Sequence, residues 1–124
     1  MRTAVAIAIA GALGALARYG LDGFVSRRTS GAFPWGTFAV NITGSFALGL
    51  VFTVLTERWA IAPWLRSSIA IGFFGAYTTF STLMLESYRL GSDREVGLAA
   101  LNVLGSCAVG MLAVYLGIVA GRAM

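Results

Sequence analysis

The stretch Gly75-Ala76-Tyr77-Thr78-Thr79-Phe80-Ser81-Thr82 interrupts an otherwise apolar segment with polar, poorly helical residues. No charged side chain occurs in residues 67–85, so the segment suits a bilayer except at this interruption. Lipid tolerates broken backbone only where the break is buried in protein or lines a cavity. We therefore predict a helix that is broken near residues 75–80, at a functional position.

Composition places the rest of the chain in the membrane as well. Of its 124 residues, 58% are hydrophobic and 11% are charged, and the mean hydropathy is +0.83. Charged residues delimit four apolar spans, the first of which continues past Arg18. We predict an all-α membrane protein with a single transmembrane domain over residues 1–124. Its helices are expected at about 3–25, 34–55, 66–88 and 96–120.

The N-terminal span has a second interpretation as a cleaved signal peptide. Arg2, the apolar run that follows it and Ala15-Leu16-Ala17 imitate the three regions of such a peptide. Gly11 and Gly14 favour a retained helix, because they lie where a helix–helix contact would use small residues.

The arginines give almost no orientation signal. With four spans, one side of the membrane carries four arginines and the other carries five: Arg2, Arg58, Arg66 and Arg122 against Arg18, Arg27, Arg28, Arg89 and Arg94. A chain without preference inserts both ways, and two opposed copies form an antiparallel, dual-topology homodimer. The alternative is that the balance is an accident of a small protein with few charges.

Residue usage excludes several classes of function. Cys107 is the single cysteine and histidine is absent, which excludes an intrachain disulfide, a zinc site and a histidine-based triad. We therefore expect no enzyme. The nine basic residues are all arginines that stand singly or in pairs at span ends, so they indicate interfacial anchors in the lipid bilayer and no nucleic-acid partner.

Two spans carry polar residues at helical spacing. Asn41 and Ser45 share a face of the second span, and Asn102 and Ser106 share a face of the fourth. Each stripe has two interpretations, a packing seam held by hydrogen bonds or the lining of a pore.

At the break itself, main-chain groups and hydroxyls are the available chemistry. Carbonyls freed from a helix suit a small hard cation such as sodium. Phe80 adds a ring whose edge is electropositive and able to contact an anion weakly, although most membrane phenylalanines only pack.

Three motifs together resemble the Fluc (CrcB) fluoride ion channels. They are Gly11 to Tyr19 in the first span, Gly36-Thr37 through Asn41 to Gly49 in the second, and Gly72 through Gly75 to Thr82 in the third. The resemblance covers nearly the whole chain. It implies four spans per subunit, an antiparallel homodimer with two pores and passive conduction of fluoride.

The resemblance also implies roles for single residues. A structural sodium ion would be bound at the dimer centre by the backbone carbonyls of Gly75 and Thr78 from both subunits. The fluoride pathway would comprise Asn41, Phe80, Ser81, Thr82, Leu83 and Ser106, with Arg18 in the vestibule. Asn41 would donate its amide, and the hydroxyls of Ser81 and Thr82 would face the Phe80 ring.

Leu83 departs from the family pattern, which usually has a second phenylalanine three residues after the first. Leucine has no ring edge, so we expect conduction with an altered rate or selectivity. Ala76 replaces a common glycine, a minor change because Gly75 remains. For Glu86 we favour a solvated acid at the end of the third span over a guard at a pore mouth.

These observations predict a fluoride-selective channel of the cell inner membrane that lowers fluoride toxicity by passive export. One alternative is a small dual-topology multidrug exporter, which requires an acid within a span, whereas the five acids here lie near span ends or in loops. Another is a membrane scaffold subunit without transport, for which the small-residue stripes would suffice.

Overall fold

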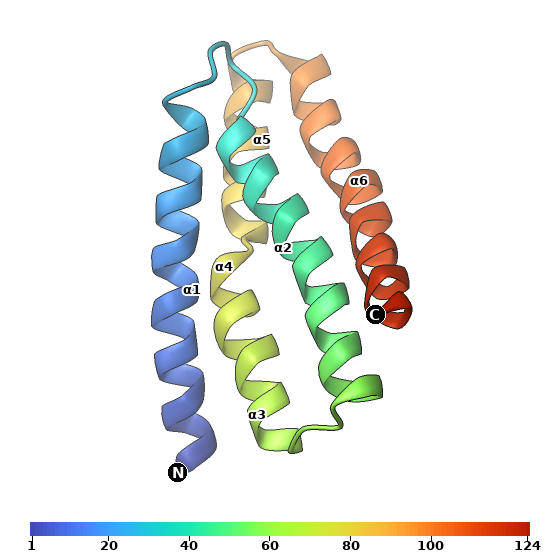
Figure 1. The fold of residues 1–124 in the computed structure, drawn as a ribbon. Coiled ribbons are helices and arrows are strands. Elements are labelled where there is room, and N and C mark those ends of the chain that lie inside the picture. Colours follow the sequence, from blue (N-terminus) through green and yellow to red (C-terminus); the bar gives the residue numbers. More distant parts are fainter.

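The chain is entirely helical in a computed structural model that describes residues 1–124. Its elements are α1 (Arg2–Ser26), α2 (Trp35–Thr53), the π-helical turn η1 (Val54–Arg58), α3 (Pro63–Ser67), the π-helical segment η2 (Ser68–Phe74), α4 (Gly75–Tyr77), α5 (Phe80–Ser92) and α6 (Val96–Ala123) (Figure 1). Joined end to end, they make four spans of 24 to 30 residues that are long and apolar enough to cross a membrane. The protein is a multi-pass membrane protein.

The third span extends beyond the predicted range of 66–88 at both ends. It begins at Pro63, which is favoured in the first helical turn because its missing N–H is not needed there. It ends at Ser92, six residues beyond Glu86. The helix continues past Glu86, whose carboxylate accepts a hydrogen bond from Thr37 of α2.

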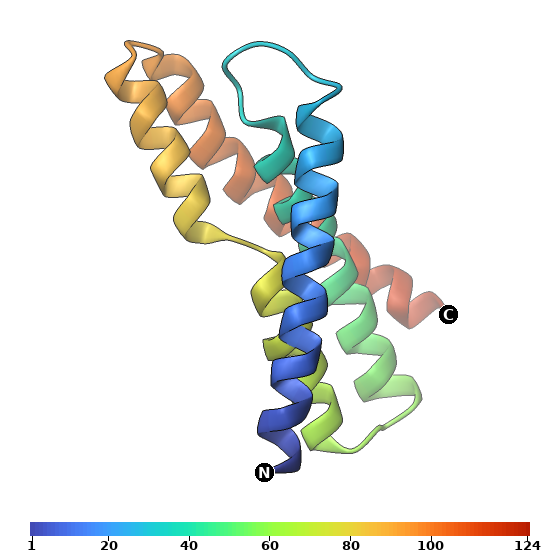
Figure 2. The ribbon, with the colours of Figure 1, turned by 90° about the vertical axis from the view of Figure 1, so that its left-hand side faces the viewer.

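The predicted break lies at Thr78 and Thr79. Both residues have extended backbone, with φ −81° and ψ 158° at Thr78 and φ −149° and ψ 110° at Thr79. The break displaces α5 from the axis of α4, as Figure 2 shows. The two halves of the span consequently have different partners: η2 and α4 pack on α1, whereas α5 packs on α6.

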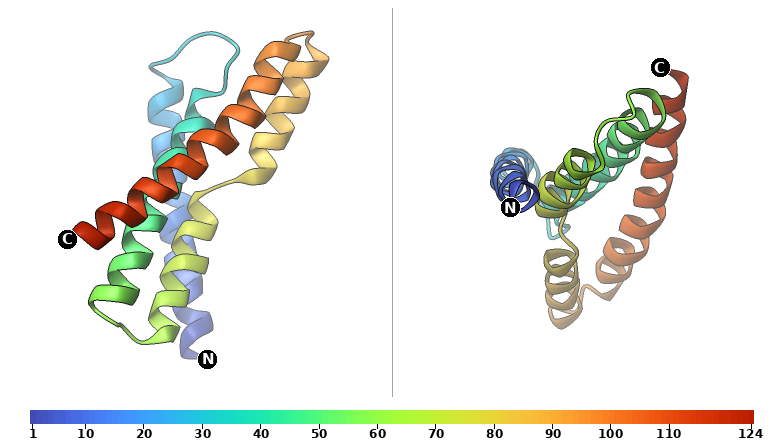
Figure 3. Two further views of the ribbon diagram at one scale, coloured as in Figure 1. Left: turned by 90° about the vertical axis from the view of Figure 1, so that its right-hand side faces the viewer. Right: turned by 90° about the horizontal axis from the view of Figure 1, so that it is seen from below.

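Small residues let the helical backbones approach closely. A Cβ atom built on Gly14 of α1 would lie 2.9 Å from the carbonyl carbon of Phe73 in η2. Likewise, one built on Gly117 of α6 would lie 2.9 Å from the backbone nitrogen of Leu50 in α2. The first contact seats α1 on η2. The second lets α6 lie against α2, while the other end of α6 packs on α5 (Figure 3).

The interior contains as many polar residues as hydrophobic ones. Only 21 of the 124 residues are buried, and seven of them are large or small hydrophobic residues while seven are polar. The buried polar residues are Thr37, Thr53, Ser68, Thr79, Ser87, Asn102 and Ser106. Most long apolar side chains point outward, as expected where lipid or another subunit surrounds the helices.

Both connections at one end, α1–α2 and α5–α6, lie opposite the N-terminus and the α2–α3 connection (Figure 1). Near the latter end, Arg122 of α6 forms an ion pair of 3.1 Å with Glu57, and Arg58 donates to the Arg122 carbonyl. Arg2 lies over the ring of Trp64 at 5.2 Å. Arg2, Arg58 and Arg122, which were expected on one side of the membrane, therefore lie near the same end of the molecule. Dual topology stays a prediction.

The close contact at Gly14 predicts an unequal response of two glycines in the same helix. Gly14→Ala is expected to lower stability by about 1–3 kcal/mol, because the new methyl group overlaps the Phe73 backbone. Gly20→Ala is the control, since nothing lies within 4 Å of its added Cβ. Melting temperatures of the two variants in detergent measure the difference, and equal values would contradict this packing.

Candidate ion pathway at the break in the third span

Asn41 of α2 holds the broken backbone at Thr79. Its Nδ2 donates to the Thr79 carbonyl at 3.1 Å, and its Oδ1 accepts from the Thr79 N–H at 2.8 Å. One side chain thus satisfies both main-chain groups of a residue that is only 8% exposed. The helix–helix hydrogen bond that the sequence offered as one interpretation of Asn41 is present. An amide has two N–H donors, and the contact with Thr79 uses one.

Two hydrogen bonds at the break, one to Asn41 and one to Thr79 Oγ1, take N–H donors away from two carbonyl groups of the helical pattern. In an α-helix, the N–H of each residue bonds to the carbonyl four residues earlier. Thr79 N–H bonds to Asn41 instead of Gly75, and Thr82 N–H bonds to Thr79 Oγ1 at 3.3 Å instead of the Thr78 carbonyl. Gly75 and Thr78 are the residues expected to bind sodium, and uncommitted carbonyl oxygens fit a hard cation.

A cavity of about 230 Å³, here named the Asn41 cavity, opens beside the break. It brings together four residues of the expected fluoride pathway from α2, α5 and α6: Asn41, Phe80, Leu83 and Ser106. Ser45, Leu48, Thr78, Thr79 and Cys107 complete its lining. The cavity therefore combines an amide, hydroxyls and an aromatic ring with few charges.

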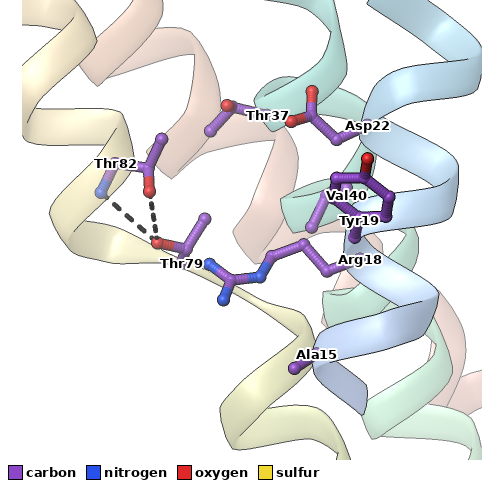
Figure 4. Close-up of a pocket in the computed structure, with 8 residues that line it drawn as sticks. All are labelled: Ala15, Arg18, Tyr19, Asp22, Thr37, Val40, Thr79 and Thr82. Carbon is purple, nitrogen blue, oxygen red and sulfur yellow. Dashed lines mark hydrogen bonds between the residues drawn. The ribbon is translucent and has the colours of Figure 1, made fainter. Parts of the chain in front are cut away.

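A second cavity of about 180 Å³, the Arg18 cavity, lies on the other side of Thr79. Its lining comprises Ala15, Arg18, Tyr19, Asp22, Thr37, Val40, Thr79 and Thr82 (Figure 4). The Arg18 side chain extends from α1 toward Thr79, whose Oγ1 donates to Thr82 Oγ1 at 2.9 Å. Thr79 lines both cavities and therefore lies between them.

Within one chain, the structure separates residues that were expected to face one another. Phe80 lines the Asn41 cavity and Thr82 lines the Arg18 cavity, because residues two apart point to opposite sides of a helix. Ser81 is exposed and lines neither cavity. Phe80 and Leu83 do share a cavity, yet Phe80 is 71% exposed whereas Leu83 is 5% exposed.

The sequence did not predict that Asp22, Thr37 and Glu86 would lie together near the Arg18 cavity. Thr37 donates to Glu86 Oε1 at 2.8 Å, and Glu86 Oε2 is buried without a partner. Asp22 lines the cavity one helical turn from Arg18. The favoured interpretation of Glu86 as a solvated acid is wrong, because its carboxylate faces α2. No sequence signal links residues 37 and 86, which only the packing of α2 against α5 brings together.

The two residues of the polar stripe on α6 have different surroundings: Asn102 packs against α5, and Ser106 lines the Asn41 cavity. Asn102 is completely buried and donates to Ser87 Oγ of α5 at 2.9 Å, as a packing seam requires. Its Oδ1 has no partner, and neither has the Oγ of Ser106, which is 6% exposed and lines the Asn41 cavity. Ser106 thus presents an unpaired polar group beside that cavity.

The family described as CrcB-like protein, Camphor Resistance (CrcB), matches residues 5–118. The chain belongs to this family. A relative from Acidobacterium capsulatum, named fluoride-specific ion channel FluC, is 47% identical over 116 residues, which cover 94% of this chain and 93% of the relative.

Two further relatives of the CrcB-family chain bear the same name. The protein from Geotalea daltonii is 46% identical over 122 residues, 98% of each chain. The one from Geotalea uraniireducens is 44% identical over 124 residues and the full length of both. The resemblance to the fluoride channels is confirmed, and so is the expectation of no enzyme, because these relatives are named as channels.

The Asn41–Thr79 contact predicts a large loss of stability in Asn41→Ala. The substitution leaves a buried N–H and a buried carbonyl unpaired, and each unpaired group costs about 1–3 kcal/mol. Ser45→Ala is the matched control on the same helix, because its hydroxyl donates only to a carbonyl of its own helix. Melting temperatures in detergent compare them, and equal losses would show that Asn41 does not hold the break.

Proposed function

We propose that this protein is a fluoride-selective channel of the cell inner membrane, which exports fluoride passively and confers fluoride resistance. The proposal rests on one structural observation, a helix break at Thr79 with an open cavity on each side of it. Relatives that match this chain over nearly its full length are named fluoride-specific ion channels, and these names support fluoride as the conducted ion.

The pathway runs from the Arg18 cavity past Thr79 to the Asn41 cavity. Asp22 lines the same cavity, but the Arg18 guanidinium forms no ion pair with it, and the Arg18 charge attracts anions into this first cavity. The hydroxyls of Thr79 and Thr82 then replace part of the water around the ion. Beyond them, the second N–H of Asn41 and the edge of the Phe80 ring provide weak contacts, and weak contacts permit rapid passage.

The break also supplies oppositely polarised helix ends. The carbonyl end of α4 is partially negative, and the N–H end of α5 is partially positive. Carbonyls of Gly75 and Thr78 would bind the structural sodium ion, whose positive charge would favour anions nearby. The start of α5 would favour the anion itself.

A second copy completes the proposed assembly. Gly75, Phe80 and Ser81 are exposed around the break, where a partner in the opposite orientation would cover them. In such an antiparallel homodimer the sodium ion lies between the two breaks, and each Ser81 reaches the pathway of its partner. The near-equal division of the arginines between the two membrane sides supports this dual topology.

The direction of transport follows from the chemistry of fluoride. Hydrogen fluoride is a weak and neutral acid that crosses membranes from acidic surroundings and dissociates in a near-neutral cytoplasm, where the ion is trapped. An inside-negative potential drives an anion outward by about 2.3 kcal/mol per 100 mV. A passive pore is therefore sufficient for export.

Purified protein in liposomes is expected to release fluoride rapidly when potassium and valinomycin set the membrane potential. A fluoride electrode measures the efflux, and chloride-loaded liposomes are the control, which should release little. Absence of fluoride release from correctly folded dimer would overturn the proposal and favour a scaffold subunit.

The inward-facing Glu86 gives the exporter hypothesis its best structural support, because proton-coupled carriers require an acid within a span. The same liposomes separate the two functions. Flux through a channel follows the fluoride gradient and the potential, whereas a proton-coupled exporter also responds to an imposed pH gradient. Hydrogen fluoride also permeates protein-free liposomes when a pH gradient is present, so their flux is subtracted. We expect the remaining, protein-dependent flux to show no response to the pH gradient at a fixed fluoride concentration and a fixed potential.

Leu83→Phe is expected to change the fluoride flux or the halide selectivity. The substitution adds a ring edge to the Asn41 cavity beside Phe80, and one aromatic contact is worth about 0.5–1.5 kcal/mol, or roughly a tenfold change at most. Leu85→Phe is the control on the same helix, because Leu85 is exposed and lines neither cavity. Efflux and selectivity indistinguishable from the unmodified chain would argue against a role for residue 83.

A further inference from the structure

The single cysteine of the chain lies in the lining of the Asn41 cavity. Cys107 is exposed near the middle of α6, and the cavity also contains Asn41, Phe80 and Ser106. A thiol at this depth has two possible surroundings, hydrocarbon or water inside the protein. Only the second allows the thiol to ionise and react with a charged reagent, because the thiolate is the nucleophile.

Ser106 supplies a second, independent observation at this cavity, a buried polar group without a protein partner. Its Oγ has no hydrogen-bond partner although the residue is only 6% exposed, and it belongs to the same lining as Cys107. Asn41 contributes a spare N–H to this space. Buried polar groups of this kind are satisfied by water or an ion when the site is polar and large enough, as a cavity of about 230 Å³ is.

We propose that Cys107 is a covalent modification site inside the ion pathway, and that a thiol-directed compound attached there closes it. The ligand class is a small thiosulfonate or disulfide that reaches the cavity from water. The closure rests on the proposed channel function, because the attached group would fill the space in which Asn41 and Phe80 contact the anion.

The chemistry is a thiol–disulfide type of exchange. The Cys107 thiol loses its proton to water, and the thiolate sulfur attacks the sulfenyl sulfur of a methanethiosulfonate. A new S–S bond forms, and the bond to the sulfonyl sulfur breaks with its electron pair on the departing methanesulfinate. The protein sulfur is oxidised to the disulfide level and the reagent is reduced, so no other reactant is needed. A dithiol reductant reverses the reaction.

The test uses purified protein in liposomes and the membrane-impermeant reagent 2-(trimethylammonium)ethyl methanethiosulfonate. We expect one adduct by intact mass, fluoride efflux reduced to that of protein-free liposomes, and recovery of efflux after dithiothreitol. Cys107→Ala should form no adduct, and its efflux should be the same before and after the reagent.

A second variant controls for depth in the membrane. Ala108→Cys, made together with Cys107→Ala, moves the thiol by one residue to an exposed position of α6 that lines neither cavity. We expect no adduct on this variant, because its thiol would face lipid or a partner helix.

The outcomes separate the inference from the proposed function. An adduct on Cys107 with unchanged efflux would overturn the closure, and no adduct would overturn the water-filled cavity. Equal labelling at residues 107 and 108 would also overturn the assignment to the cavity. Absence of fluoride efflux before any reagent is added would instead refute the channel function, and intact mass would still decide whether the Cys107 thiol meets water.

Discussion

The two hydrogen bonds between Asn41 and Thr79 are the interaction on which the structure depends. An extended residue inside a membrane span leaves a donor and an acceptor without helical partners, and lipid offers no substitute. Asn41 supplies both partners from the neighbouring span. Because these bonds keep the Thr79 N–H from its helical acceptor, they also leave the Gly75 carbonyl uncommitted. The hydrogen bonds that satisfy the broken backbone are therefore also the ones that keep this carbonyl out of the helical pattern.

The break divides the third span between two packing partners. Its first half stays with α1, where Gly14 allows the backbones to touch, and its second half moves to α6. Cavities arise on both sides of Thr79 because the helices diverge there. Close packing of small residues elsewhere keeps the bundle together around these openings.

The distribution of polar groups matches a molecule that carries ions through its interior. Buried polar residues are as numerous as buried hydrophobic ones, and the long apolar side chains lie outside. The buried hydroxyls of Ser68 and Ser87 donate to carbonyls four residues earlier. By contrast, Ser106 Oγ, Asn102 Oδ1 and the second oxygen of Glu86 have no partner. These unpaired groups mark the places where the fold leaves hydrogen-bonding capacity unused by the protein itself.

The sequence by itself determined the class of the protein, the four spans and the position of the break. Apolar length, charge spacing and helix propensity are local properties, so residues 67–85 reveal both a span and its interruption without knowledge of any partner. The family resemblance, carried by three motifs, added the sodium ligands and the pathway residues as expectations. The predicted end of the third span at residue 88 was too early, because Glu86 was interpreted as an acid at the end of the helix, whereas the helix continues to Ser92.

Only the tertiary structure decided which groups meet. Asn41 bonds to a residue 38 positions away, and Thr37 bonds to Glu86 across 49 positions. The extended residues at the break reset the helical phase of α5, which places Phe80 and Leu83 in one cavity, Thr82 in the other and Ser81 in neither. Such pairings depend on how α2, α5 and α6 pack together, and helix packing is a property of distant surfaces that no local pattern in the sequence records.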